Sequence, residues 1–170
     1  YDDELSLRIE WEKRPNKAGL EIEIIEINEE FTFDDQDIKI KSIEVQHQPV
    51  EPAYGYEFLV KNKKITYSGD TKYSKNLENA SKNAEYLIHE VFVDLNFDDK
   101  RMTQDTLKNV REYHSTPEDV GKLAQAANVK NLVLNHFVPP VFDEELLKNE
   151  ISKYYDGKII VGSDLDVFNL

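Results

Sequence analysis

The hydrophobic pattern changes its period near residue 70, and this change limits the folds that the chain can adopt. Before that point, apolar residues alternate with polar ones, which is typical of strands that bury one face. The expected strands lie within residues 20–25, 31–33 and 38–45, followed by a hairpin of residues 54–60 and 65–68. The first part of the chain therefore predicts an antiparallel sheet.

Beyond residue 70, helical segments alternate with short apolar segments that are typical of buried strands. One helix start is explicit, because Thr116 can serve as the N-cap and Pro117 fits the first helical position. Helices are expected at residues 74–82, 106–113, 117–127 and 143–155, and strands at 86–89, 132–135, 158–161 and 166–168. Antiparallel strands followed by βα units predict a mixed α/β fold, with two stacked layers and helices outside.

Length and composition describe one globular domain, which we take as residues 1–170 because no repeat or linker divides the chain. The net charge of −13 would repel a polyanion over much of the surface, which disfavours bulk nucleic-acid binding. No segment resembles a membrane span or a secretory leader, so we expect no membrane partner. The compartment cannot be read from the sequence, and a cytoplasmic location is favoured.

Three residues at the ends of expected strands form a candidate metal site. The chain has no cysteine, so any metal must be held by histidine and carboxylate. Asp70 directly follows a strand and a glycine, His47 follows an alternating strand, and His136 ends an apolar run. Each has a simpler explanation alone, as a turn aspartate or a packed histidine. Together, two imidazoles and a carboxylate that can bridge suit zinc, manganese or iron.

A second pair of residues could assist chemistry at such a site. His114 lies just before the capped helix, and its unperturbed pKa of about 6.5 suits a proton donor, although it could simply belong to the helix start. Glu90 is another carboxylate at a strand end and could orient His114.

Blocks around these residues occur in an order that resembles the ribonuclease Z and arylsulfatase-like branch of the metallo-β-lactamase superfamily. The blocks are H-Q-P-V at 47–50 with A-Y-G-Y at 53–56, S-G-D-T at 68–71, I-H-E at 88–90, H-S-T at 114–116, L-N-H-F at 134–137 and V-G-S-D-L at 161–165. The resemblance implies an αββα sandwich and a metal-dependent hydrolase of sulfate or phosphate esters. It also implies two zinc ions, with His47, Asp70 and His136 as ligands and Asp70 as the bridge. His114 would then act on the leaving oxygen, with Glu90 holding its ring.

One departure from the family concerns completeness. The H-x-H-x-D-H block that supplies the other metal ligands in this family does not occur in the sequence. We therefore expect only the C-terminal part of the sandwich, with partial or no metal occupancy and no activity in this chain alone. A missing N-terminal half or a second copy of the chain is the expected partner.

A second departure concerns the substrate. Ribonuclease Z itself carries a long tRNA-binding arm between the ligand histidine strand and the S-G-D-T block, whereas residues 56–68 fill that interval here. Together with the acidic balance, this favours a small anionic ester, as in arylsulfatase-like or phosphodiesterase-like relatives. A tRNA 3′-processing endonuclease of the ribonuclease Z type is one alternative. A non-catalytic scaffold or interaction domain that has lost its metal is another.

Overall fold

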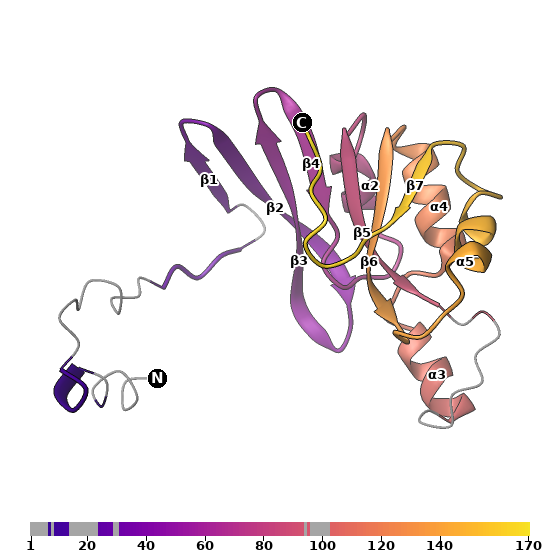
Figure 1. The fold of residues 1–170 in the computed structure, drawn as a ribbon, viewed down its shortest axis with the longest axis horizontal. Helices are drawn as coiled ribbons and strands as arrows, with labels where there is room; N and C mark the ends of the chain where they lie inside the picture. The colour runs from indigo at the N-terminus through magenta and orange to yellow at the C-terminus, as the bar shows by residue number, and fades with distance from the viewer. Residues whose placement is uncertain (1–6, 8, 14–23, 29–30, 94, 96–102) are drawn as a thin grey trace.

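The fold, taken from a computed structural model, is described for residues 7, 9–13, 24–28, 31–93, 95 and 103–170. The described strands form one seven-stranded sheet, in which spatial order follows sequence order (Figure 1). The strands are β1 (Thr32–Asp35), β2 (Ile38–His47), β3 (Val50–Val60), β4 (Lys63–Tyr67), β5 (Tyr86–Phe92), β6 (Asn131–Val138) and β7 (Lys158–Val161). Strands β1 to β4 pair antiparallel, and β4 to β7 pair parallel, as the change of pattern near residue 70 predicts.

The hairpin between β3 and β4 closes with the shortest common turn. Lys61 and Asn62 both have positive φ, 48° and 65°, which is typical of a two-residue turn that matches the twist of the strands. No room remains for an inserted arm at this position.

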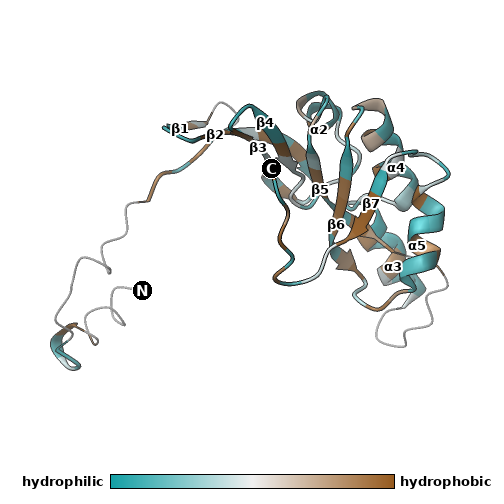
Figure 2. Cartoon of the chain, turned by 45° about the horizontal axis from the view of Figure 1, so that its top comes forward, coloured by the Kyte–Doolittle hydropathy of each residue, from teal (hydrophilic) through white to brown (hydrophobic). Residues whose placement is uncertain are grey.

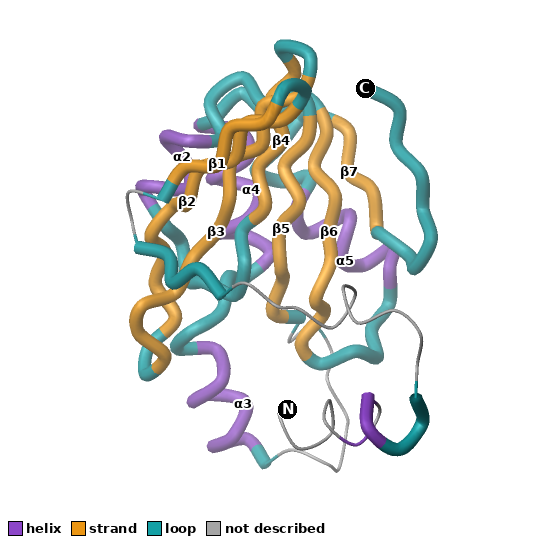
Figure 3. The backbone as a smooth tube through the Cα atoms, turned by 90° about the vertical axis from the view of Figure 1, so that its left-hand side faces the viewer, coloured by secondary structure: helices purple, strands orange, loops and turns teal. Residues whose placement is uncertain are grey.

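The helices begin at capping residues that the sequence provides. They are α2 (Lys75–Ala80), α3 (Gln104–Arg111), α4 (Pro117–Ala126) and α5 (Glu144–Ile151), capped by Ser74, Thr103, Thr116 and Asp143. At α4 the Thr116 hydroxyl accepts from the N–H of Asp119, and the Asp119 carboxylate accepts from the N–H of Thr116. Helices α2, α4 and α5 cover one face of the sheet, while α3 lies beyond the edge where the parallel strands end (Figures 1 and 3).

The core lies between the sheet and this helical layer. Leu87 and Leu132 from the strands meet Leu123, Leu147 and Ile151 from the helices, and all five are fully buried. Each such side chain contributes about 1.5–3 kcal/mol of hydrophobic free energy. Because strand residues alternate between faces, the core fixes which strand residues point to the opposite face.

The opposite face carries an apolar row that runs across four strands. Tyr67, Ile88, Val133 and Ile160 are paired in register from β4 to β7. No described helix covers this face (Figure 3). The described residues form one sheet and one helical layer. These two layers are part of the αββα sandwich. Coverage of the open face by a further segment or a second copy stays a prediction.

The tail after β7 does not form the strand expected at residues 166–168. Its backbone turns back at Ser163, whose N–H donates to the carboxylate of Asp166, and then crosses the open face (Figure 2). There the Phe168 ring lies 5.6 Å from the ring of Tyr86, and the Tyr86 hydroxyl donates to the carbonyl of Asn169 over 3.2 Å. One ring contact and one hydrogen bond, rather than edge pairing, therefore join the tail to this face.

The strand expected at residues 20–25 lies mostly outside the described residues. Residues 24 and 25 are described and belong to no strand. Among the described residues, no helix has the length and apolar character needed to cross a bilayer.

Candidate metal centre

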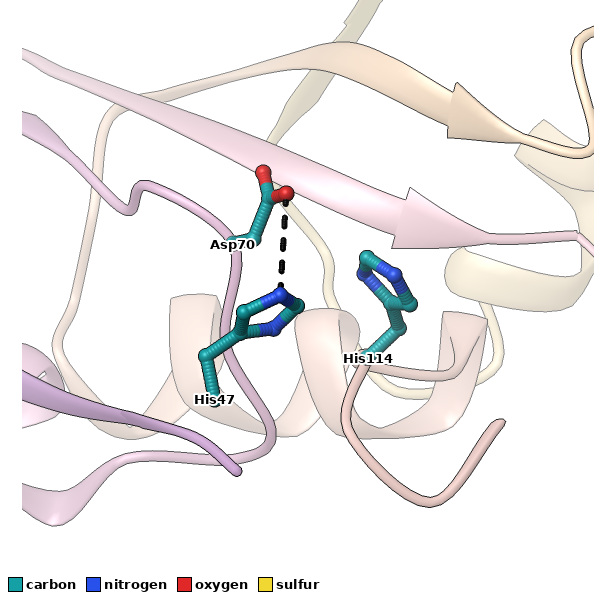
Figure 4. Close-up of side chains that lie close together, drawn as sticks. All are labelled: His47, Asp70 and His114. Carbon is teal, nitrogen blue, oxygen red and sulfur yellow. Dashed lines mark ion pairs between the residues drawn. The ribbon is translucent and has the colours of Figure 1, made fainter. Parts of the chain in front are cut away.

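The side chains singled out in the sequence come from five separate segments and meet at one edge of the sheet. His47 is the last residue of β2, Asp70 follows β4, Glu90 and His136 lie near the ends of β5 and β6, and His114 lies between α3 and α4. Figure 4 shows His47 and His114 turned toward the carboxylate of Asp70. The parallel strands explain this convergence, because their carboxyl ends share one edge.

A glycine places Asp70. Gly69 has a φ of +59°, and a Cβ added there would lie 2.5 Å from the backbone oxygen of Tyr54. Only glycine fits such a turn without strain and steric overlap. Ser68 ties the turn to the next strand, because its hydroxyl accepts from the N–H of Glu90 over 3.0 Å. Ser68 and Gly69 therefore each have a structural role in placing Asp70.

A β-bulge places His136. Glu90 pairs with Asn135 and Val91 pairs with Phe137, so His136 is the extra residue in β6. It has a φ of +40°, a conformation that residues other than glycine adopt at a cost. The bulge brings its Nε2 to within 3.3 Å of Oδ2 of Asp70.

A backbone carbonyl orients His47. Nδ1 of His47 lies 2.9 Å from the carbonyl oxygen of Tyr113, and the Tyr113 ring packs edge-on against the imidazole at 5.2 Å. Because a carbonyl oxygen only accepts, Nδ1 must carry the proton in this hydrogen bond. The lone pair is then on Nε2, which lies 4.0 Å from Oδ2 of Asp70.

Glu90 orients His114 and joins the surrounding loops. Its Oε1 accepts from the backbone N–H of Thr71 at 3.2 Å and of Ser115 at 3.0 Å, and lies 3.1 Å from Nδ1 of His114. The carboxyl group is almost completely buried, so these bonds are shielded from water. With its Nδ1 proton directed at Glu90, His114 presents Nε2 on its other side.

His47, Asp70 and His114 form a set of three possible metal ligands. One ligand atom from each lies within 4.8 Å of the others, and among the described residues this is the group of three that meets that spacing. His136 approaches the set from the other side of Asp70, with its ring 5.8 Å from the ring of His114. Ligand atoms around tetrahedral zinc lie about 3.4 Å apart, given bond lengths of about 2.1 Å. The donor atoms and their spacing therefore fit a divalent ion after small side-chain movements.

The fourth histidine lies outside this cluster. His89 is completely buried on β5, and its Nδ1 lies 2.6 Å from the carbonyl oxygen of Glu90. Burial lowers the pKa of its imidazole below the ordinary value, because the charged form would lose its hydration. His89 is therefore a neutral core residue.

Two supporting groups escaped the sequence analysis. The Tyr113 carbonyl orients His47, and a carbonyl belongs to every residue type, so no sequence signal marks it. Thr71 connects β2 to the centre, because its hydroxyl accepts from the N–H of Gln46 while its own N–H donates to Glu90. The S-G-D-T block contains Thr71, so its presence in that block was the available signal.

The comparison with protein families identifies the chain. Residues 3–137 match the family described as "Beta-lactamase superfamily domain". The chain belongs to the metallo-β-lactamase superfamily. Within it, the chain is similar to ribonuclease Z of Mycobacterium tuberculosis, with 27% identity over 147 residues that cover 85% of this chain and 53% of that protein. This superfamily chain thus spans about half the length of the curated relative, and its similarity lies with the ribonuclease Z branch.

Solved structures show the same metallo-β-lactamase fold. The metallo-β-lactamase fold protein YhfI from Bacillus subtilis superposes with a TM-score of 0.65 and 19% identity, covering 81% of this chain and 52% of that one. Human tRNase Z, short form, superposes with a TM-score of 0.55 and 23% identity, covering 81% of this chain and 44% of that one. At these identities the likeness establishes the fold alone.

Proposed function

We propose that this protein is a metal-dependent hydrolase of phosphate esters, with His47, Asp70 and His136 as metal ligands and His114 with Glu90 as the pair that handles the proton. The observation that carries the proposal is the position of the Asp70 carboxylate, whose Oδ2 lies 3.3 Å from Nε2 of His136 and 4.0 Å from Nε2 of His47. An aspartate with a histidine on each side is suited to bridge two ions.

The chemistry follows from the charges and hydrogen bonds of these groups. A divalent metal held by His47, Asp70 and His136 would lower the pKa of bound water and neutralise negative charge on an attacked phosphoryl group. Glu90 accepts the Nδ1 proton of His114 and so fixes the orientation of the ring. When Nε2 of His114 is protonated, it can donate that proton to the leaving oxygen. A general acid of this kind contributes about 10²–10⁴-fold to the rate.

For the substrate, the ribonuclease Z relatives support a precursor tRNA cleaved near its 3′ end. The acidic composition favoured a small ester over tRNA, and the relatives reverse this preference. The shared catalytic requirement is a phosphodiester, because both a tRNA linkage and a small phosphate diester present one negative charge at the attacked group.

A small anionic ester is the second candidate, and two observations favour it. The β3–β4 hairpin closes after Val60 with a two-residue turn, which leaves no tRNA-binding arm at that position. A surface cavity of about 460 Å³ beside His114 is lined by charges of both signs, namely Lys72 and Arg111 together with Glu112, Glu118 and Asp119. A long polyanion would meet these carboxylates, whereas a small ester need not.

An assay of the natural full-length protein tests the proposal. We expect cleavage of a precursor tRNA with a 3′ trailer in the presence of Zn²⁺ or Mn²⁺, and slower or no hydrolysis of bis(p-nitrophenyl) phosphate and p-nitrophenyl sulfate. His114→Gln should lower the rate at least about 100-fold. His89→Gln alters a histidine outside the cluster and serves as the control for a general histidine effect. Cleavage of the small esters alone would support the second candidate, and no hydrolysis with either metal would leave a non-catalytic scaffold.

A further inference from the structure

The two oxygens of the buried Glu90 carboxylate are used unequally. Oε1 accepts three hydrogen bonds, from the backbone N–H groups of Thr71 and Ser115 and from Nδ1 of His114. Oε2 is also buried and, among the described residues, has no hydrogen-bond partner. A buried carboxylate oxygen without a donor is unfavourable, because it has lost its water and gained nothing in return. We therefore expect a donor for Oε2 close to it.

Asn135 is the neighbour of Glu90 across the β5–β6 pair and the last regularly paired residue before the bulge at His136. The two residues are in register, so their side chains point to the same face from strands about 5 Å apart. The Asn135 oxygen Oδ1 is buried and, within the part of the chain that the structure describes, also lacks a partner. A turn of the amide by 180° about its last side-chain bond exchanges this oxygen for the nitrogen with little change of shape. Nδ2 of Asn135 can then donate to Oε2 of Glu90.

The hydroxyl groups around Glu90 are already engaged as donors. They belong to Ser68, Thr71 and Ser115, and each donates to a backbone carbonyl oxygen at 2.6–2.7 Å. Each hydroxyl has one proton, so none of the three has a second proton for Oε2. His89 precedes Glu90 in β5, so the alternation of the strand turns its imidazole to the opposite face. The amide of Asn135 is therefore the donor that the register places beside this oxygen.

We propose that Asn135 is a positioning residue, whose Nδ2 donates to Oε2 of Glu90 and so holds the carboxylate against His114. The inference rests on the proposed function, in which Glu90 orients His114 for proton donation. A carboxylate held at both oxygens cannot turn about its last side-chain bond, so Oε1 stays directed at Nδ1 of His114. Without the donor on Asn135, the carboxylate can turn and the imidazole loses its fixed orientation. Residues of this supporting kind commonly affect activity without touching the reacting atoms.

A matched pair of substitutions isolates the donor. Asn135→Thr and Asn135→Val introduce β-branched side chains of nearly the same shape, and only threonine has a hydroxyl that can donate to Glu90. In the natural full-length protein with Zn²⁺, Asn135→Val should lower kcat about 10–100-fold for the precursor tRNA, with KM little changed. Asn135→Thr should stay at least about threefold faster than Asn135→Val, because it restores one hydrogen bond.

Two controls separate positioning from damage to the structure. Asn135 is next to the proposed ligand His136, so the bound Zn²⁺ per chain is measured for both variants and should equal that of the unsubstituted protein. Thermal unfolding checks that both variants are folded. A fall in kcat that follows a loss of Zn²⁺ would assign the effect to His136 and overturn the inference. Equal kcat values for Asn135→Thr and Asn135→Val would also overturn it.

The side-chain amide of Asn135 provides a readout that does not depend on hydrolysis. In ¹H–¹⁵N spectra of the natural full-length protein, one proton of its NH₂ group should lie downfield and exchange with solvent more slowly than those of the exposed Asn62. The downfield shift should decrease in Glu90→Gln, because a neutral oxygen accepts less strongly than a carboxylate. An Asn135 amide with the shift and exchange rate of Asn62 would overturn the inference.

The outcomes distinguish this inference from the proposed function. If the full-length protein cleaves neither the precursor tRNA nor bis(p-nitrophenyl) phosphate, the proposed function fails. The amide spectra then still decide whether Asn135 holds Glu90. If the protein cleaves its substrate and the amide of Asn135 is free, the proposed function stands and the inference fails.

Discussion

Nε2 of His136 lies 3.3 Å from Oδ2 of Asp70 because a β-bulge in β6 turns the histidine out of the regular strand. The bulge leaves His136 with a φ of +40°, where a side chain with a Cβ is strained by about 1–2 kcal/mol. Strain of this kind persists when the surrounding structure enforces it, and it gathers at functional sites.

This strain gives a first prediction about stability. His136→Gly should stabilise the fold by about 1 kcal/mol relative to His136→Ala, because glycine adopts positive φ without a Cβ penalty. Urea denaturation of the two variants measures the difference in the free energy of unfolding. Equal midpoints for the two variants would show that the backbone of this bulge is not strained.

The buried carboxylate of Glu90 should be essential to the fold as well as to His114. In Glu90→Ala, the N–H groups of Thr71 and Ser115 lose their acceptor in a buried place, at a cost of about 1–3 kcal/mol for each. Glu90→Gln keeps an acceptor oxygen and should cost less. Thermal and urea unfolding of both variants check this order, and a Gln variant as unstable as the Ala variant would contradict it.

The turn before Asp70 should not tolerate a Cβ. In Gly69→Ala, the new methyl group would meet the backbone oxygen of Tyr54, and the positive φ would add strain. Both effects destabilise, and we expect a loss of about 2–4 kcal/mol in the free energy of unfolding. Denaturant unfolding measures it. A loss below about 0.5 kcal/mol would mean that the turn moves freely and does not fix Asp70.

Burial of His89 predicts a specific pH dependence of stability. Its pKa in the folded protein is below the ordinary value of 6.5, so below that pH the unfolded chain binds a proton that the folded one does not. Stability should thus be fully present above pH 6.5 and fall as the pH decreases, by up to about 1.4 kcal/mol per pH unit. The folded-state pKa of His89 sets the lower end of this range.

Urea midpoints between pH 7.5 and 5.5 measure this effect. In His89→Leu the contribution of this imidazole is removed, so the decline toward pH 5.5 should be smaller than in the unsubstituted protein. The other titrating groups remain in both proteins and cancel in the comparison. Parallel pH profiles would contradict a buried neutral His89.

The sequence predicted the elements that depend on local pattern. Alternation marked β2 and the β3–β4 hairpin, and Thr116 as N-cap with Pro117 after it marked the start of α4. The strand expected at residues 166–168 was wrong, because this segment contacts the open face of the sheet through the Phe168 ring and leaves Val167 85% exposed instead of pairing with an edge. Alternation alone does not show whether a segment pairs with a strand.

Most residues of the candidate site could also be recognised from the local sequence pattern. Strand ends carry no apolar pattern of their own, so a histidine or carboxylate there stands out in the sequence. Tyr113 did not stand out, because its contribution is a backbone carbonyl. The proximity of His114 to His47 and Asp70 depends on how the loop after α3 folds back over β2, a long-range contact without a local signal.

The central claim is that side chains distant in sequence converge on Asp70 to bind a metal ion. Anomalous X-ray scattering at the zinc absorption edge, from crystals of this chain grown with Zn²⁺, tests it most directly. We predict an anomalous peak within bonding distance of Asp70 and of at least one of the two flanking histidines, His47 and His136. The absence of a peak beside Asp70, with zinc bound elsewhere on the surface, would contradict the claim.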